Sequence, residues 1–564
     1  MNSESRVFLS NFKTMLKTQN FYLILLFGTA LIIHFSLSLV GWNNTIFDLH
    51  DFRQSQTAIT TLYILKEGFR LNYITPILGA PWSIPMEFPI YQWLVAALVS
   101  LLKTPLEQTG RLVSLLSFYL SLFPIYSLLS YFIKNKNNRL LLLVIILFNP
   151  LYLFWSRTFM IESMTLFFCL MFLWGLFKFL DGKKPVYLVL TVIMGSFGGL
   201  LKITTFAAFC FPALMLFLLF WWRKSGDSYS KTLKPSSLGG ITAGFRKKNS
   251  SIISRTWFTF RENKSRFAPK LLLLYAFYGF VMVIIPLIIS LVWIHYADLQ
   301  KSFNPLADFL NSKTMSGWNF GTLKQRLSPH VWFIIMSHST VFELAFGASQ
   351  TWGKIILFTL LGVLASSVIL NLRYRREILF CFLFWLFPPL VFTNLYYVHT
   401  YYSYASGVFI SIGIGFLFLS LWEIKKVRRI IFIFALPAFL TFCLWLYGIS
   451  YYPAQKNNNL AYQTIAEAIS KNVPKDGVLL IYGLDWNASL PYASERKSIM
   501  DMRNLPLTDS KIQKSLKELG ELKIKGMVIA GDRPTDFIQE QIDYFGFLPN
   551  PIYENDKYKL YISP

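Results

Sequence analysis

The sequence is poor in charged residues for a chain of this length. Only 15% of its 564 residues are Asp, Glu, Lys or Arg, whereas soluble domains average about 25%. Acids are especially scarce, with 29 against 54 Lys and Arg, so the formal net charge is +25. A nucleic-acid-binding protein with this net charge would be rich in Lys and Arg overall. The composition therefore excludes that class, a disordered chain and an ordinary soluble enzyme.

Cysteine is also scarce, which excludes a small domain held together by disulfides. The four cysteines lie in apolar runs, without CxxC pairs or Cys/His metal spacing: Cys169, Cys210, Cys381 and Cys443. They are expected to be small buried side chains. No Walker A motif is present either, so the sequence shows no sign of a P-loop nucleotide site.

Apolar residues, by contrast, make up 54% of the chain, and they occur in runs long enough to cross a bilayer. Residues 1–20 are polar and basic, and Phe21–Gly41 is expected to be a retained first transmembrane helix with a cytoplasmic start. Ten further spans are expected at 110–132, 139–155, 159–180, 186–201, 203–222, 271–293, 353–372, 377–396, 403–421 and 429–449. The predicted fold is thus a polytopic helical membrane protein with about 11 transmembrane helices.

The short apolar run 89–102 is expected to lie in the membrane interface, and the loop charges support that choice. If residues 89–102 do not cross the membrane, the cytoplasmic segments carry a summed formal charge of +22. The outer segments 42–109 and 295–354 then carry −1 and +2. Positive loops face the cytoplasm, so this topology is preferred. Its most basic piece is the cytoplasmic loop 223–270, at +10. The chain would end on the outer side.

Residues 452–564 differ from the rest and are expected to form a small extracytoplasmic α/β domain after the transmembrane domain 21–451. Val478–Tyr482 and Gly526–Ala530 have the apolar pattern of strands, and Leu460–Lys471 and Lys511–Leu519 have that of helices.

Four polar clusters fall on the outer side in this topology. The first is a dense group at the start of loop 42–109, comprising Asp48, His50, Asp51, Arg53 and Gln56. The others are a short loop with Arg157 and Glu162, the isolated Lys202, and a tyrosine-rich segment with His399, Tyr401 and Tyr402. A carboxylate here could act as a general base, and cations could bind a phosphate.

Structural explanations compete with these functional ones. The charges of the first loop could pair with one another, Arg157 and Glu162 could form an ion pair across their hairpin, and Lys202 could extend to the interface as long cationic side chains do. The location of all four clusters on one side nevertheless favours one shared outward-facing site.

Taken in order, these residues resemble the GT-C membrane glycosyltransferases, especially bacterial members of the dolichyl-phosphate-mannose protein mannosyltransferase family, which includes aminoarabinose transferases. The resemblance covers about residues 20–450 and rests on these strings: His50-Asp51-Phe52-Arg53-Gln54-Ser55-Gln56-Thr57-Ala58, Met86-Glu87-Phe88-Pro89-Ile90-Tyr91-Gln92-Trp93, Gly110-Arg111, Arg157–Glu162, Lys202, and His399–Tyr402.

The resemblance implies an inner-membrane bacterial enzyme that transfers a sugar, with inversion, from a polyprenyl-phosphate donor to a protein, lipid or glycan acceptor. Asp51 is the predicted base, with Asp48 as its rival and Glu162 as a second catalytic carboxylate. Arg53, Arg157, Lys202 and His399 are predicted to bind the donor phosphate. Contacts to sugar or acceptor are predicted for His50, Gln56, Glu87, Tyr91, Tyr401 and Tyr402.

The sequence also departs from the family pattern. Relatives often have Asp-Glu where His50-Asp51 stands, and Lys-Pro-Pro where Glu87-Phe88-Pro89 stands, so a phosphate-binding lysine is missing. No cofactor is required by the sequence. A divalent cation with Asp51 and Glu162 as ligands is left open, since some GT-C enzymes use one.

Two other functions remain open from the sequence. A flippase or transporter of lipid-linked glycans would need polar residues deep in several spans. A polymerase or ligase of such glycans would share the donor side and differ in its acceptor. Partners in every case are membrane lipids and lipid-linked sugars, and no nucleic acid is expected.

Overall fold

The computed structural model describes residues 19–232, 274, 277–339, 350–424, 427, 430–500 and 505–564. The predicted cytoplasmic N-terminus therefore lies almost wholly outside the described residues. So does most of the basic loop 223–270, of which only residues up to 232 are described, as the end of a helix.

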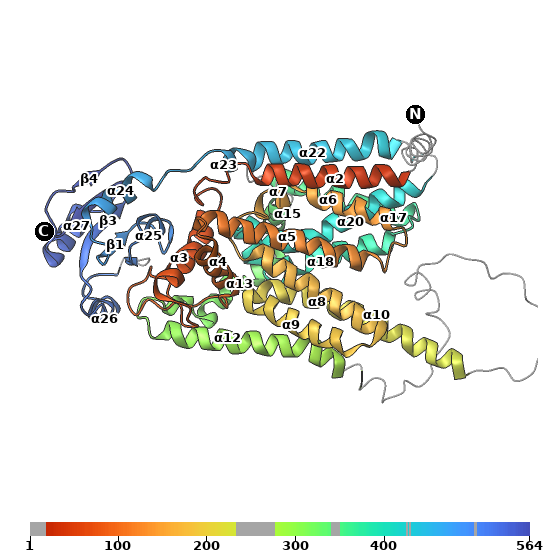
Figure 1. Cartoon of the computed structure of the whole chain (residues 1–564), viewed down its shortest axis with the longest axis horizontal. Coiled ribbons are helices and arrows are strands. Elements are labelled where there is room, and N and C mark those ends of the chain that lie inside the picture. Colours follow the sequence, from red (N-terminus) through yellow and green to blue (C-terminus); the bar gives the residue numbers. More distant parts are fainter. Residues whose placement is uncertain are drawn as a thin grey trace, which may run out of the picture.

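A bundle of helices runs along the long axis of the molecule (Figure 1). Its members are α2 (Gln19–Ser38), α5 (Leu106–Leu129), α6 (Lys136–Phe148), α7 (Pro150–Trp155), α8 (Glu162–Gly182), α9 (Pro185–Leu201), α10 (Ile203–Thr232), α12 (Ile285–Ser302, preceded by a π-helical turn at Phe280–Ile284), α17 (Gln350–Ile369), α18 (Arg375–Val391), α20 (Ser403–Glu423) and α22 (Leu436–Ser450, preceded by a π-helical turn at Ile431–Ala435).

Each expected span contains helix in the structure. Seven helical segments within the described residues are long and apolar enough to cross a membrane: Phe21–Ser38, Leu106–Leu129, Glu162–Gly182, Phe277–Ser302, Gln350–Ile369, Thr400–Glu423 and Ile433–Ser450. Shorter apolar helices include Pro185–Leu201 and Ile203–Leu218. The span expected at 139–155 is two helices, because Asn149 is extended and caps α7 through its side chain. The fold class is confirmed, and the count of eleven and the orientation remain predictions.

Close packing at the end of α9 helps to place a candidate site residue. A Cβ atom added at Gly199 would lie 2.1 Å from the hydroxyl oxygen of Ser290 on α12. Small residues let helices approach in a membrane, where close packing drives association. Lys202 follows directly, as the extended residue between α9 and α10.

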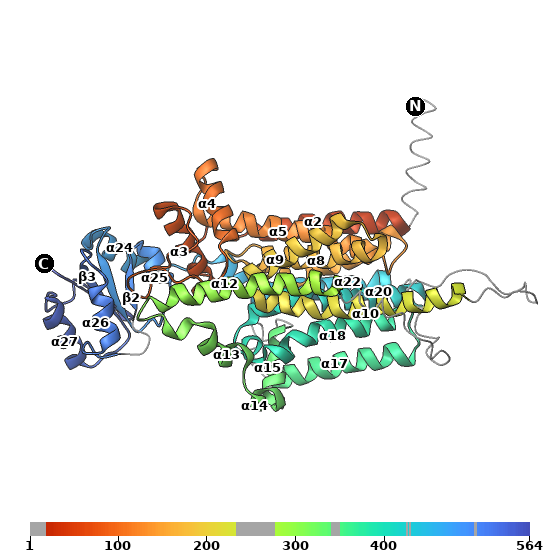
Figure 2. The ribbon, with the colours of Figure 1, turned by 90° about the horizontal axis from the view of Figure 1, so that it is seen from below.

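Both outer loops contain more helix than the sequence predicted. Loop 42–109 contains α3 (Asp51–Glu67) in addition to the expected α4 (Ile90–Leu102). Loop 295–354 contains α13 (Ser312–Phe320), α14 (Leu323–Leu327) and α15 (Pro329–Ser339), and α19 (Thr393–Val398) follows α18. These helices are short or mixed in polarity, so the search for long apolar runs missed them. Figure 2 shows α4 projecting sideways from the bundle, as expected for an interfacial helix.

The chain after Tyr451 forms the expected α/β unit at the end of the bundle where α3 and α4 lie (Figure 1). The helices are α23 (Tyr452–Lys456), α24 (Gln463–Asn472), α25 (Ser489–Ser494), α26 (Ser510–Lys517) and α27 (Thr535–Phe545), and the strands are β1 (Val478–Tyr482), β2 (Ser498–Met500), β3 (Ile524–Ala530), β4 (Tyr553–Glu554) and β5 (Tyr558–Ile562). The sheet order is β2-β1-β3-β5-β4, with β1 parallel to β2 and β3, and β5 antiparallel to β3.

The first outer loop extends this sheet. The amide of Ser498 donates to the Pro76 carbonyl at 2.9 Å, and the amide of Gly79 donates to the Ser498 carbonyl at 3.1 Å. A further bond joins the Met500 amide to the Ile77 carbonyl at 3.1 Å. The predicted outer domain therefore shares a sheet edge and an apolar core with the loop that carries the first polar cluster.

Arg111 on α5 holds the start of that loop in place, so the Arg111→Ala variant should be strongly destabilised. Its guanidinium is 1% exposed and donates to the carbonyls of Trp42, Asn44 and Thr45 at 2.7–2.8 Å. Each buried carbonyl left without a donor costs about 1–3 kcal/mol. We expect the free energy of unfolding in detergent to fall by about 3 kcal/mol or more. The exposed Arg70→Ala variant is the control, and equal stability of the two would contradict this role.

Candidate active site

The first polar cluster lies at the start of α3, beyond the end of α2. His50 has a left-handed backbone conformation, with φ of 53°, and turns the chain into the helix at Asp51. Asp51 therefore lies in the first turn of α3, where the helix dipole favours a negative charge. The structure places Asp51 half-buried.

Two ion pairs join this cluster to other segments, and a third joins the second cluster to the third. The Arg157 guanidinium lies 3.4 Å from Asp48, the Arg53 guanidinium 3.0 Å from Glu87, and the Lys202 ammonium 2.8 Å from Glu162. The Arg157–Glu162 pair considered as a structural alternative is not formed, since each of these residues pairs elsewhere. Pairing within the first loop is realised by Arg53 and Glu87, whereas Asp48 pairs with Arg157 of the second outer loop. Lys202 pairs with Glu162, and 10% of its side chain is exposed.

The two rival aspartates have different surroundings. The Asp48 side chain is 6% exposed, and it accepts hydrogen bonds from Gln54 and from the Arg157 guanidinium. Burial and nearby Arg111 together lower the pKa of Arg157 to about 10, whereas the Asp48 charge raises it, so Asp48 stabilises this cation. Asp51 instead accepts hydrogen bonds only from hydroxyl groups within the described residues, those of Tyr462 at 3.1 Å and Ser489 at 3.0 Å.

Arg53 is held by two partners on the bundle side of α3. Its guanidinium donates to Gln56 at 2.8 Å and to Glu87 at 3.0 Å, and Glu87 also accepts from Gln92 at 2.8 Å. Burial by itself would lower the pKa of Arg53, but the carboxylates of Glu87 and Glu162 raise it above the usual value. Glu87 thus fixes the Arg53 cation at this position.

Lys202 brings the second, third and fourth clusters together. Its ammonium lies 3.8 Å from the ring centroid of Tyr402 and 5.0 Å from that of Tyr401, while pairing with Glu162. The second carboxylate oxygen of Glu162 and the amide nitrogen of Gln56 are buried and have no hydrogen-bond partner among the described residues. Buried polar atoms rarely lack partners, so these two are suited to bind groups of a ligand.

Histidines and aromatic rings form the remaining wall. The ring centroid of His50 lies 5.1 Å from that of Tyr401 and 6.0 Å from that of His399, and its Nε2 lies 3.0 Å from the Thr400 hydroxyl. The His399 ring lies 6.2 Å from that of Trp318 on α13. Burial lowers the pKa of both histidines to about 4, so both are neutral at pH 7. A neutral His399 can donate a hydrogen bond to a phosphate but adds no charge.

These lowered pKa values make stability depend on pH. The unfolded chain takes up protons at these histidines near pH 6.5, whereas the folded protein resists protonation until about pH 4. Their contribution to stability is therefore complete above pH 6.5 and falls as the pH drops toward 4. We expect the thermal unfolding midpoint to be lower at pH 5 than at pH 7.5, and His399→Gln to weaken this dependence. The exposed His330→Gln variant is the control; an unchanged pH dependence in His399→Gln would contradict the prediction.

The structure thus joins residues of all four clusters through direct contacts, whereas the hydroxyl of Tyr91 is bonded to groups outside them. Tyr91 is fully buried, and its hydroxyl donates to the Gly110 carbonyl at 2.8 Å and lies 2.9 Å from the Ser114 hydroxyl. We therefore leave Tyr91 out of the proposed contact set. Tyr462 and Ser489 were missed, because nothing in the sequence connects a residue 400 positions away with Asp51.

The side chains do not fit the divalent cation that the sequence left open. No group of three or more His, Cys, Asp or Glu side chains converges as metal ligands within the described part of the chain. Glu162 is neutralised by Lys202, and one oxygen of Asp51 is bonded to two hydroxyls. A hard cation would need several free oxygen ligands, so no step below depends on one.

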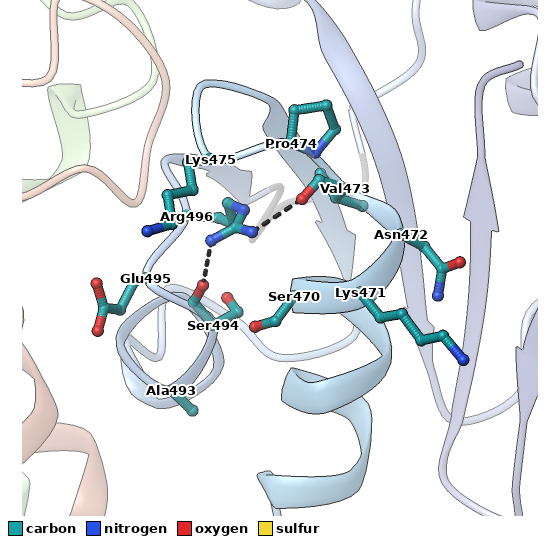
Figure 3. A pocket seen from close by; sticks show the side chains of 10 residues that line it. All are labelled: Ser470, Lys471, Asn472, Val473, Pro474, Lys475, Ala493, Ser494, Glu495 and Arg496. Atoms are coloured by element: carbon teal, nitrogen blue, oxygen red, sulfur yellow. Dashed lines mark hydrogen bonds between the residues drawn. The ribbon is translucent and has the colours of Figure 1, made fainter.

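A polar pocket of about 560 Å³ lies elsewhere, between α24 and α25 (Figure 3). Its buried cation, Arg496, donates to the carbonyls of Val473 and Ser494 at 2.8 Å each, at the ends of those two helices. The guanidinium thus satisfies helix-terminal carbonyls. None of the predicted site residues lines this pocket, and we assign it a structural role.

Comparison with known proteins supports the resemblance seen in the sequence. Residues 84–233 match the family described as dolichyl-phosphate-mannose-protein mannosyltransferase. The structure is similar to that of ArnT from Cupriavidus metallidurans bound to undecaprenyl phosphate, with a TM-score of 0.56, 10% identity, and coverage of 96% of this chain and 98% of that one. The chain has the fold of the GT-C glycosyltransferases.

Two further structures agree with this fold. ArnT in the apo state gives a TM-score of 0.54 at 12% identity, covering 96% of this chain and 97% of that one. The oligosaccharyltransferase AglB from Archaeoglobus fulgidus, in complex with an inhibitory peptide and a dolichol-phosphate, gives 0.52 at 13% identity, covering 90% and 69%. No curated protein sequence matches the chain. The resemblance to GT-C glycosyltransferases predicted from the sequence is confirmed.

Proposed function

We propose that this protein is an integral-membrane glycosyltransferase of the bacterial inner membrane. It transfers a sugar from a polyprenyl-phosphate donor to a protein, lipid or glycan acceptor, at the outer face. The observation that carries the proposal is a carboxylate, Asp51, that has no cation partner among the described residues. It lies in the first turn of α3, directly after His50, whose ring contacts Tyr401 in the aromatic wall around Lys202 within the GT-C fold. The lipid carriers named with the ArnT and AglB structures support the donor class.

The proposed reaction is a single displacement. Asp51 accepts the proton of the acceptor's hydroxyl or amine while the acceptor atom attacks the anomeric carbon from the face opposite the phosphate. The bond between that carbon and the phosphate oxygen breaks, and the polyprenyl phosphate leaves with the electron pair. The sugar is therefore transferred with inversion. No nucleotide is required, because the lipid-linked sugar is already activated.

The phosphate that leaves gains negative charge, which the nearby cations would stabilise. Lys202 and Arg53 are our leading candidates for direct contact, with His399 as a neutral donor. Arg157 is 1% exposed and donates to the Val40 carbonyl at 3.0 Å, so we propose that its charge acts through Asp48 and not by contact.

The sugar and acceptor would lie against the mixed polar and aromatic wall. The Gln56 amide nitrogen would donate to a sugar hydroxyl or a phosphate oxygen, and the Glu162 oxygen would accept from a hydroxyl. Tyr401 and Tyr402 would offer ring faces to a sugar. His50 and Glu87 border the same space through their contacts with Tyr401 and Arg53.

The direct test incubates the purified protein with a panel of undecaprenyl-phosphate sugars and candidate acceptors. We expect release of undecaprenyl phosphate together with a labelled acceptor for at least one donor. Transfer of intact donor between the leaflets of proteoliposomes, without release of lipid phosphate, would support the transporter alternative. Release with growth of a glycan chain would support the polymerase alternative.

A further inference from the structure

The C-terminal α/β unit reaches into the candidate active site through two hydroxyl groups. Tyr462, just before α24, and Ser489, the first residue of α25, both donate to the same oxygen, Oδ2, of Asp51. These residues lie more than 400 positions after Asp51 in the chain. We infer that this unit completes the active site, with Tyr462 and Ser489 as positioning residues for the Asp51 carboxylate. The inference rests on the proposed function of Asp51 as the base.

Both hydroxyls are held rigidly by their surroundings. Ser489 is fully buried, and its oxygen also lies 3.1 Å from the Ser55 hydroxyl on α3. Tyr462 is 9% exposed, and its ring makes an edge contact with Phe47 at a centroid distance of 5.1 Å. Side chains fixed by packing can orient a catalytic group, because little conformational freedom remains to be lost in the reaction.

The choice of oxygen gives the carboxylate a defined orientation. Oδ2 accepts both hydroxyl protons, whereas Oδ1 accepts none within the part of the chain that the structure describes. Asp51 is also only half-buried, so its second oxygen is available to the acceptor. With Oδ2 fixed, the Asp51 side chain cannot rotate freely about its last bond, and Oδ1 presents a constant direction for proton transfer.

Other contacts hold the unit against the bundle, so these two bonds are not needed for docking. Residues 76–79 extend the sheet at β2. Lys66 pairs with Glu495 at 2.7 Å, and the side chain of Asn44 donates to the Gln455 and Lys456 carbonyls. Removal of a hydroxyl from Tyr462 or Ser489 should therefore change the orientation of Asp51 without releasing the unit.

The test uses the full chain with Tyr462→Phe, Ser489→Ala and the double variant. With the donor and acceptor that give turnover in the panel, we expect kcat to fall about 10-fold for each single variant and about 100-fold for the double. KM for the donor should change less than about twofold, since the hydroxyls do not touch it. Ser489→Thr retains a hydroxyl and should recover much of the activity lost in Ser489→Ala.

Matched controls separate positioning from structural effects. Tyr544→Phe and Ser563→Ala remove hydroxyls elsewhere in the same unit, bonded to Gln513 and Lys525 respectively. Glu495→Gln weakens an exposed docking pair without touching Asp51. All three should keep wild-type kcat, and all variants should unfold at similar temperatures. Equal loss of kcat in Glu495→Gln would mean that docking, and not orientation, explains the effect and would overturn the inference.

The failure of this inference can be told apart from failure of the proposed function. If Asp51→Asn is inactive while the Tyr462 and Ser489 variants keep wild-type kcat, Asp51 is the base and the positioning role is wrong. If Asp51→Asn is active, the proposed base is wrong. A structure of the double variant provides a readout without turnover: an unmoved Asp51 carboxylate would overturn the positioning role even if no donor in the panel is used.

Discussion

The Asp51→Asn variant is expected to lose sugar transfer by about 10²–10⁴-fold, the range by which general bases accelerate reactions. Asn has the same shape as Asp, but its amide cannot accept the acceptor's proton at neutral pH. Because Asp51 has no cation partner among the described residues, no buried charge is left unpaired by the change. The variant should therefore insert into the membrane and unfold at a temperature close to that of the wild type. Release of undecaprenyl phosphate measures the loss.

The rival base provides an internal comparison for this experiment. Asp48→Asn leaves the buried Arg157 cation without its counter-ion, so this variant should lose stability as well as activity. Asp536→Asn, an exposed carboxylate on α27, serves as the matched neutral control. Near-normal transfer by Asp51→Asn, together with inactivity of a stably folded Asp48→Asn, would assign the base to Asp48 instead.

Lys202→Ala is expected to reduce both stability and use of the lipid donor. The side chains of Lys202 and Glu162 are 10% and 5% exposed, and one oxygen of Glu162 already lacks a partner. Removal of the cation would leave a buried, uncompensated carboxylate, which typically costs about 3–5 kcal/mol. Lys66→Ala removes one partner of an exposed ion pair and should cost about 1 kcal/mol or less. Thermal or denaturant unfolding in detergent measures the difference.

A double variant separates the two roles of Lys202. Lys202→Met with Glu162→Gln removes both charges at once, so much of the lost stability should return. If Lys202 also contacts the donor phosphate, transfer should remain at least about 10-fold below wild type, the effect of losing a charge-assisted hydrogen bond. Recovery of both stability and donor use in the double variant would remove Lys202 from the phosphate site.

Much of the fold could be predicted because its pattern is local. Long apolar runs located the long helices of the bundle, and short apolar stretches located β1 and β3. The helix α3 was missed because its mean polarity resembles that of a solvated loop, although most of its length is buried against the bundle and the C-terminal unit. Burial of a polar helix depends on its partners, which are distant in the chain.

The sequence predicted candidate site residues, but it did not predict which of their charges form ion pairs with one another. A pair between Arg157 and Glu162, five residues apart, was one alternative from the sequence, whereas the partner of Arg157 in the structure is Asp48, 109 residues away. Glu162, in the second polar cluster, pairs with Lys202, 40 residues later in the chain. Charge types and their side of the membrane can be read along the chain, but the choice among several opposite charges depends on how the helices pack.

The sequence by itself determined that this is a helical membrane protein, and it placed the useful charges in four short segments. Both follow from the cost of exposing polar groups to lipid, which acts on every residue wherever its neighbours lie. Only the tertiary structure decided that Asp51 has no cation partner within the described part of the chain, and that Tyr462 and Ser489 hold it. Those facts depend on contacts across more than 400 residues, which the folding of the outer loop onto the C-terminal sheet creates.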